Sequence, residues 1–434
     1  MPLLHNARLV LPSGVVEDGW LAVEGTGITG IGASGGPETA ARTAASVPAP
    51  ASASVSTPAS TSAASAPDQS PGAVLPEGRF PDPGDRFDLG GFYVVPGFVD
   101  LHVHGGGGAA FSSGEAEQSR MAAAFHLSHG TTTVMASTVT GELADLERYV
   151  AELAELVQGG ELAGIHLEGP FISKARCGAH NPDLLRAPEP AAVKRLLRAG
   201  KGAVRMVTLA PELEHGITAT GLLADAGVIA AIGHTDATYA QANLAIARGA
   251  RVATHVFNAM RPVHHREPGP VTAALEQEDV IVELVNDGLH VHPAVAGLVF
   301  AAAGAHRTAL ITDAMSAAGS VDGVYTLGTL AVEVSGGVAR VAGTDTIAGS
   351  TLTMDEALRN AVHSVGVPIE DAVVSASLTP ARALGLADRI GSLELGKQAD
   401  LCVLDGDLRV VAVMRRGRWV HGMGVTAFSP LVAY

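Results

Sequence analysis

The chain has 434 residues, which is too long for one compact core of ordinary size but suits an α/β barrel joined to a smaller unit. Hydrophobic residues make up 47% of it and aromatic residues only 4%, so Ala, Val, Leu and Ile must build the core, as in helices packed on parallel strands. The net charge of −16 argues against nucleic acid as the main partner, because phosphate backbones would be repelled. A phosphorylated small molecule stays compatible, since a local group of Arg, His and metal can outweigh the overall field within a pocket.

Targeting signals are lacking in the sequence. No apolar stretch reaches the ~20 residues that a bilayer-spanning helix needs, and the first thirty residues lack the basic start and apolar block of a secretory signal. The two cysteines, Cys177 and Cys402, are too few for a disulfide framework, and we interpret Cys177 as an incidental loop residue. These features predict a cytoplasmic protein with no membrane partner.

Both ends of the chain have the texture of short β-strands separated by glycine turns. Between them, residues 39–74 consist almost entirely of Ala, Ser, Pro and Thr, a composition typical of a disordered loop. We therefore predict a small β-sandwich domain assembled from residues 1–95 and 389–434, with the loop at 39–74 extending from it.

The middle of the chain, residues 96–388, alternates short β-branched runs with stretches of helical period. Within it, Leu143, Leu146, Val150 and Leu153 recur at steps of three and four, which predicts one apolar helix stripe. Eight strands close a parallel barrel, so the fold class predicted is α/β, with a (β/α)8 barrel of the TIM type. The eight strand candidates are "YVVPGFVDLHVH", "TTTVMAST", "AGIHLEG", "AVRMVTLAP", "GVIAAIGHT", "RVATHVFNA", "VIVELVND" and "TALITDA".

Histidines and acids gather where these candidate strands end, which is the active-site end of such a barrel. The residues are His102 and His104 on the first strand, Glu168 on the third, His234 on the fifth, His255 on the sixth and Asp313 on the eighth. Side chains two apart on a strand share a face, so His102 and His104 can both point into the barrel mouth. His166, two residues before Glu168, is expected to be a packed histidine that faces the other way, deeper in the barrel.

Imidazole and carboxylate ligands together suit Zn²⁺, Fe²⁺ or a similar divalent ion. The HxH pair alone is weak evidence, because histidines near glycine-rich loops are common, and the other strand-end ligands strengthen it. Such an ion would lower the pKa of its water so that hydroxide is the nucleophile at cell pH. Asp313 could then take a proton from that water and pass it to a leaving group.

With these residues placed, the chain resembles the amidohydrolase superfamily and, within it, the deacetylase family that acts on N-acetylglucosamine 6-phosphate. The resemblance covers residues 96–354 and a C-terminal segment, "LTPARALGL" through "GSLELGKQADLCVLD". Its motifs are "PGFVDLHVHG", "GIHLEGPFIS", "GAHNP", "TLAPE", "GHTDATY", "THVFNAMRPVHHREPG", "DGLHV", "TDAM" and "AGSTLTM". The Ala/Ser/Pro stretch has no counterpart in the family pattern.

The resemblance implies hydrolysis of the acetamide to acetate and glucosamine 6-phosphate, in the catabolism and recycling of amino sugars. It implies that Glu168, His234 and His255 hold the metal and that Asp313 is the general base and acid. His102 and His104 would hold a second ion, so one or two ions are expected per subunit. The substrate contacts implied are Asn258, the backbone of Ala259 and Arg266 at the phosphate, with Arg266 reaching across a homodimer, and His180 and His290 at the sugar or the amide carbonyl.

Two alternatives stay open at this point. A cyclic-amide hydrolase or a nucleobase deaminase could use the same scaffold, although the former usually bridges two metals with a modified lysine where this chain has Glu168. A deaminase would not need the phosphate-binding features of the "NAM" and "REPG" motifs. From another class, a non-catalytic scaffold protein would be expected to have lost ligands, whereas every ligand position is filled.

Overall fold

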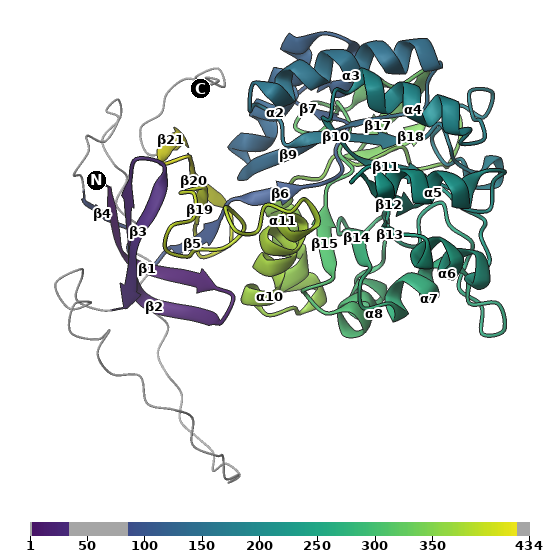
Figure 1. Ribbon diagram of the computed structural model, residues 1–434. Coiled ribbons are helices and arrows are strands. Elements are labelled where there is room, and N and C mark those ends of the chain that lie inside the picture. The colour runs from purple at the N-terminus through teal and green to yellow at the C-terminus, as the bar shows by residue number, and fades with distance from the viewer. Residues whose placement is uncertain (1, 34–85, 423–434) are drawn as a thin grey trace.

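The computed structural model describes residues 2–33 and 86–422, and it places a large α/β barrel beside a small β-domain (Figure 1). The segment at 39–74 that we predict to be a loop lies outside the described residues. Among the described residues, no helix is long and apolar enough to cross a membrane.

The predicted (β/α)8 barrel is confirmed. Its eight strands pair in parallel in the order β15-β14-β13-β12-β11-β10-β9-β6. Two backbone hydrogen bonds draw the ends of this sheet together, from Asp313 N to His102 O (2.8 Å) and from His104 N to Ala314 O (2.8 Å). The strands are β6 (Phe98–Asp100), β9 (Thr131–Thr138), β10 (Gly164–Glu168), β11 (Val204–Leu209), β12 (Ile229–Ile232), β13 (Ala250–Ala253), β14 (Ile281–Val285) and β15 (Thr308–Ile311).

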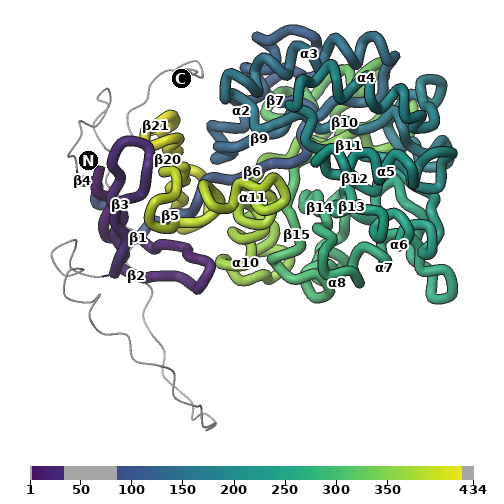
Figure 2. Tube along the Cα trace, viewed as in Figure 1, coloured from purple at the N-terminus to yellow at the C-terminus, as the bar shows by residue number. Residues whose placement is uncertain are grey.

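The first strand candidate proves to be two strands, because the chain changes sheets at Gly97. Residues before it form β5 (Tyr93–Pro96) in the small domain, and β6 follows in the barrel. Figure 2 shows the chain passing from the small domain into the barrel at this point. A Cβ at Gly97 would lie 2.2 Å from Thr132 Oγ1, so only glycine allows this close approach.

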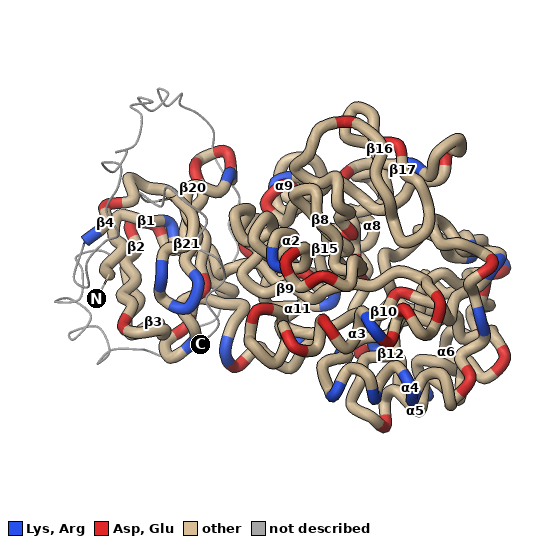
Figure 3. Tube along the Cα trace, turned by 90° about the horizontal axis from the view of Figure 1, so that it is seen from above, with Lys and Arg blue, Asp and Glu red and all other residues tan. Residues whose placement is uncertain are grey.

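Helices cover the outside of the barrel (Figures 1 and 2). The predicted stripe on α3 is confirmed, since Leu146, Val150 and Leu153 are all buried. Along the chain, residues of both charge signs are interspersed (Figure 3). The α-helices are α2 (Ala116–Ser128), α3 (Leu143–Gln158), α4 (Pro190–Ala199), α5 (Gly216–Asp225), α6 (Tyr239–Ala247), α7 (Gly269–Glu276), α8 (Pro293–Ala303), α9 (Met354–Asn360), α10 (Ile369–Val373) and α11 (Thr379–Ala383). Short 3-10 helices form η1 (Phe111–Ser113) and η2 (Lys174–Arg176), and π-helical segments form η3 (Ala361–Val365) and η4 (Val374–Leu378).

The small β-domain draws its strands from both sides of the barrel segment, as the sequence predicts. They form one sheet, β21-β20-β19-β5-β1-β2-β3, with β4 paired to β1. The rings of Phe87 on β4 and Trp419 on β21 meet edge to face at 5.7 Å, so the sheet folds over a shared core. Besides β5, the strands are β1 (Leu3–Leu11), β2 (Gly14–Glu24), β3 (Gly27–Ala33), β4 (Arg86–Asp88), β19 (Leu401–Leu404), β20 (Val410–Arg415) and β21 (Arg418–His421). The domain boundaries at residues 95 and 388 stay a prediction.

Two insertions stand at the carboxyl ends of the barrel strands. After β6, the glycine-rich segment forms a short hairpin of β7 (Gly105–Gly106) and β8 (Ala109–Ala110). After β15, a three-stranded antiparallel sheet follows, made of β16 (Gly323–Leu327), β17 (Leu330–Ser335) and β18 (Val338–Val341). The second insertion contributes Leu327 to a cavity at this end of the barrel.

Candidate active site

A cavity of about 250 Å³ opens at the carboxyl ends of the barrel strands. Nearly all of the polar residues that the sequence singles out line it. Its lining comprises His104, Glu168, Gly178, Ala179, His180, His234, His255, Asn258, Ala259, His290, Asp313, Leu327, Thr346, Ile347 and Gly349.

The strand ends explain this convergence. Glu168 is the last residue of β10, while His102, His234, His255 and Asp313 each follow two residues after β6, β12, β13 and β15. His255 therefore lies just beyond its strand rather than on it. The backbone of His234, His255 and Asp313 has positive φ (47°, 26° and 50°), a conformation that costs non-glycine residues about 1–3 kcal/mol each. Such strain concentrated at one cavity is typical of a functional site.

The carboxylate of Glu168 is the centre of the first group of side chains. Its Oε1 lies 2.9 Å from His255 Nε2 and 3.0 Å from His234 Nε2, and these two nitrogens are 3.0 Å apart. Its Oε2 lies 3.2 Å from both His104 Nε2 and His180 Nε2. Burial raises the pKa of Glu168, but the surrounding histidines, His102 first, outweigh burial and hold it well below its usual range.

A second group consists of His102, His104 and Asp313, of which the last two line the cavity. The Nε2 atoms of the two histidines are 3.1 Å apart, and Asp313 Oδ1 lies 3.2 Å from His104 Nε2 and 3.5 Å from His102 Nε2. Burial raises the pKa of Asp313, and the charges of His102 and His104 more than offset it, so the net shift is strongly downward. Asp313 is therefore a carboxylate at neutral pH, as a general base must be.

These side chains fit a divalent cation. Ligands of a tetrahedral zinc ion stand about 3.4 Å apart, which is close to the nitrogen and oxygen separations in both groups. Among the described residues, no Lys or Arg is hydrogen-bonded or ion-paired to the buried carboxylates of Glu168, Glu283 and Asp313. Without a metal the compensating protons fall on histidine: burial lowers the pKa of His102, but Glu168 and Asp313 raise it well above its usual value.

Hydrogen bonds at the far ring nitrogen decide which histidines can be ligands. His234 Nδ1 lies 3.0 Å from the carbonyl of Arg176, and His102 Nδ1 lies 3.3 Å from Glu283 Oε2, so both Nδ1 atoms donate and each Nε2 is the nitrogen left for an ion. His180 is reversed: the backbone N–H of Thr140 donates to its Nδ1 (3.3 Å), and the Thr140 hydroxyl, 2.8 Å from the same nitrogen, can donate as well. The proton is then on Nε2, which lies 3.2 Å from Glu168 Oε2. Burial lowers the pKa of His180 to about 4, so the ring is neutral and presents a donor to the cavity.

The expected substrate contacts divide into two sets. His180, Asn258, Ala259 and His290 line the cavity, as predicted. Arg266 does not: it is exposed on the loop after β13, with Nη1 2.7 Å from His265 Nε2. Within one chain Arg266 is therefore separate from the group, and its expected action on a partner subunit stays a prediction.

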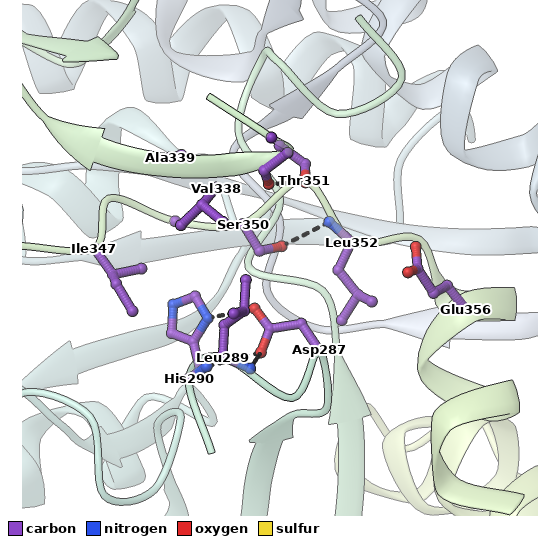
Figure 4. Close-up of a pocket in the computed structure, with 13 residues that line it drawn as sticks. Asp287, Leu289, His290, Val338, Ala339, Ile347, Ser350, Thr351, Leu352 and Glu356 are labelled. Carbon is purple, nitrogen blue, oxygen red and sulfur yellow. Dashed lines mark hydrogen bonds and ion pairs between the residues drawn. The ribbon is translucent and has the colours of Figure 1, made fainter. Parts of the chain in front are cut away.

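His290 forms a wall between this cavity and a second one of about 200 Å³, and both are also lined by Ile347 and Gly349. Figure 4 shows His290 held by Asp287 on that side, through a hydrogen bond of 2.7 Å from Nδ1 to Oδ2. The other nitrogen, Nε2, lies 4.0 Å from Asp313 Oδ2. Burial lowers the pKa of His290, but the Asp287 carboxylate raises it by more, so the ring is a good hydrogen-bond donor.

Sequence reasoning missed some of these neighbours. Glu283 and Asp287 were not singled out, although an acid inside the apolar run "VIVELV" is itself a sign of a buried polar role. The orientation expected for His166 is wrong: it lies under the site, on the same strand face as Glu168, with its ring 4.5 Å from that of His102. It is packed as predicted, between Ser137 Oγ (2.9 Å) and Thr208 Oγ1 (2.8 Å).

The fold and this arrangement define a metal-dependent type of hydrolase, and comparison with known proteins agrees. The chain belongs to the amidohydrolase family, whose sequence pattern matches residues 93–420.

Particular relatives narrow the class further. The chain is 38% identical over 336 residues to N-acetylglucosamine-6-phosphate deacetylase of Bacillus subtilis, covering 75% of this chain and 83% of that protein. It is also 38% identical over 333 residues to N-acetylgalactosamine-6-phosphate deacetylase of Escherichia coli O157:H7, covering 76% and 86%. A solved structure of N-acetylglucosamine-6-phosphate deacetylase from Mycobacterium smegmatis, a mutant in complex with N-acetylglucosamine 6-phosphate, superposes with a TM-score of 0.83 at 44% identity, covering 96% of this chain and 98% of that one.

Proposed function

We propose that the protein hydrolyses the acetamide of N-acetylglucosamine 6-phosphate, releasing acetate and glucosamine 6-phosphate. The observation that carries the proposal is the convergence of Glu168, His234, His255 and Asp313 on one cavity that Asn258 also lines. Relatives that share most of the chain's length are named for this activity, among them the Bacillus subtilis and Mycobacterium smegmatis proteins. A cytoplasmic location agrees with the sequence and stays a prediction.

The ion-binding residues proposed are Glu168, His234 and His255, with His102 and His104 at a second position. We expect Zn²⁺ or Fe²⁺, because the donors are imidazole nitrogens and carboxylate oxygens. When bound, such an ion polarises the carbonyl and supplies an activated water at neutral pH. The Arg176 carbonyl accepts a hydrogen bond from His234 Nδ1–H, so His234 Nε2 is the nitrogen left to bind the ion.

Asp313 is the proposed general base and acid. As an ionised carboxylate in the cavity, it accepts a proton at Oδ from the attacking water and returns it to the nitrogen of the departing sugar amine. His180 Nε2–H and His290 Nε2–H are donors on the same cavity wall and suit the oxygen on which negative charge develops. This assignment keeps His180 as a substrate contact rather than a metal ligand, because its Nε2 carries a proton.

The phosphate contacts proposed are Asn258, the backbone N–H of Ala259 and Arg266 of a second subunit. Arg266 offers a planar fork that matches phosphate, and its exposure on its own chain leaves it free to reach a neighbour's cavity. A mixing experiment tests the homodimer. Subunits with Arg266→Ala and subunits with Asp313→Asn should each be nearly inactive, yet mixed dimers should regain activity, since one site then has both residues. Absence of recovery after confirmed subunit exchange would count against the shared site.

A second candidate substrate is N-acetylgalactosamine 6-phosphate, which is favoured by the equally identical Escherichia coli relative. The two sugars differ only in the orientation of one hydroxyl, so a single assay decides between them. Purified protein of counted metal content is incubated with each sugar phosphate, and acetate and primary amine are measured together. We expect equal amounts of both products, faster from the glucosamine derivative. If no amine forms from either sugar, the proposed function is wrong.

A further inference from the structure

Glu283 is a buried acid for which the reaction proposed above gives no role. It sits in the middle of β14 between apolar residues, and its side chain is fully buried. Its Oε2 lies 3.3 Å from His102 Nδ1 and 3.4 Å from the backbone N of His255, while Oε1 has no hydrogen-bond partner among the described residues.

Burying a carboxylate without a cation is costly, so such a residue needs a compensating partner. No Arg or Lys of the described chain pairs with Glu283, and the polar contacts of its carboxylate are the two to His102 and His255. Both of these residues belong to the proposed metal-binding set. Within the part of the chain that the structure describes, the Glu283 carboxylate therefore has its polar neighbours at the site itself.

The contact with His102 has a direct chemical effect. By accepting a hydrogen bond from Nδ1–H, Glu283 fixes the rotation of the ring and keeps this proton on Nδ1. Nε2, which lies 3.1 Å from His104 Nε2 and 3.5 Å from Asp313 Oδ1, is then the nitrogen left for an ion. A negative charge behind an imidazole also makes it a stronger ligand. His104 differs, because its buried Nδ1 has no hydrogen-bond partner among residues 2–33 and 86–422, so that within the HxH pair this support belongs to His102 alone.

The contact with His255 joins the two groups of side chains. The same Oε2 faces the backbone N–H of His255, whose φ of 26° is strained, and this bond helps to hold that turn. One oxygen atom thus touches a residue of each proposed ion position.

We propose that Glu283 is a positioning residue, which orients the His102 ring and makes its Nε2 a stronger ligand for the second divalent ion. This inference rests on the metal-binding part of the proposed function.

The test compares the full-length protein with Glu283→Gln, which removes the charge, and Glu283→Met, which removes charge and hydrogen bond. Glu161→Gln is the matched control, because Glu161 is also buried but pairs with Arg120, away from the cavity. Each protein is stripped of metal, reloaded with Zn²⁺, and analysed for bound zinc and for both affinities by competition with a chromophoric chelator. Thermal melting of the metal-free proteins serves as a structural readout.

We expect two zinc ions in the parent protein and in Glu161→Gln. In Glu283→Gln, affinity for one ion should fall about 10–100-fold and that for the other should stay unchanged, with a larger loss in Glu283→Met. The metal-free Glu283→Gln protein should melt no lower than the parent, because a buried charge has been removed.

Unchanged affinity for both ions in Glu283→Gln, or a lower melting temperature of its metal-free form as the sole effect, would overturn the inference and show a purely structural role. A parent protein that binds one ion and releases acetate would also overturn it while leaving the proposed function intact. A parent protein that binds no zinc and releases no acetate would remove the proposed function itself.

Discussion

Replacing Asp313 by Asn tests the proton transfer that the site geometry suggests. Asn keeps the volume of the side chain, but its amide is not basic, so it cannot accept a proton from water. General acid and base catalysis contributes about 10²–10⁴-fold, or roughly 3–5 kcal/mol of barrier, and Asp313 is proposed for both steps. We therefore expect kcat to fall by at least about 10³-fold with KM changed only a few-fold.

The measurement is steady-state acetate release, with bound metal counted in the same samples. Metal must be counted because Asp313 Oδ1 lies 3.2 Å from His104 Nε2, so the substitution could weaken the second ion. The ion at Glu168 and His234 should be retained. Asp345→Asn, in the exposed loop that borders the same cavity, is the control and should behave as the parent. A kcat within about tenfold of the parent, with metal retained, would refute the proton-transfer role.

Other predictions follow from metal and proton binding. Removing metal with a chelator should lower the melting temperature, since an ion held only by the folded state stabilises it, and His234→Ala should abolish that difference; equal melting with and without chelator would count against a bound ion. Asn258→Ala should raise KM for the phosphorylated sugar several-fold and leave kcat nearly unchanged; a selective kcat loss would exclude a pure binding role. Burial lowers the pKa of His126 from 6.5 to about 4, so the unfolded chain takes up a proton there more readily than the folded protein does. The free energy of unfolding should therefore be highest above pH 6.5 and fall by up to about 3 kcal/mol as the pH drops toward 4. In chelator-treated protein, the free energy of unfolding in urea should change less between pH 6.5 and 4 for His126→Gln than for the parent. The same pH dependence in both proteins would contradict the assignment to His126.

The barrel could be predicted because each strand is a short apolar run that ends in a polar residue. The last seven strand candidates each overlap one barrel strand, whereas the first was divided at Gly97. Periodicity could not locate that division, since β5 and β6 are both apolar and the change of sheet depends on the close approach of Gly97 to Thr132.

The site was predictable to the extent that its residues end strands. Glu168, His234, His255 and Asp313 meet because parallel strands bring their carboxyl ends to one rim. Glu283 was not predicted as a site residue, because it lies within β14 rather than at its end and contacts the site through His102 and His255. Such a role depends on which ring nitrogen it faces, which spacing along one strand does not encode.

The central claim, hydrolysis of a phosphorylated N-acetyl amino sugar, is tested most directly by comparing kcat/KM for acetate release from N-acetylglucosamine 6-phosphate and from N-acetylglucosamine. Loss of two or more charge-assisted phosphate contacts predicts a preference of at least about 10²-fold for the phosphorylated sugar, at about 1.5 kcal/mol each. Equal kcat/KM for the two sugars, or activity on the unphosphorylated sugar alone, would contradict the account.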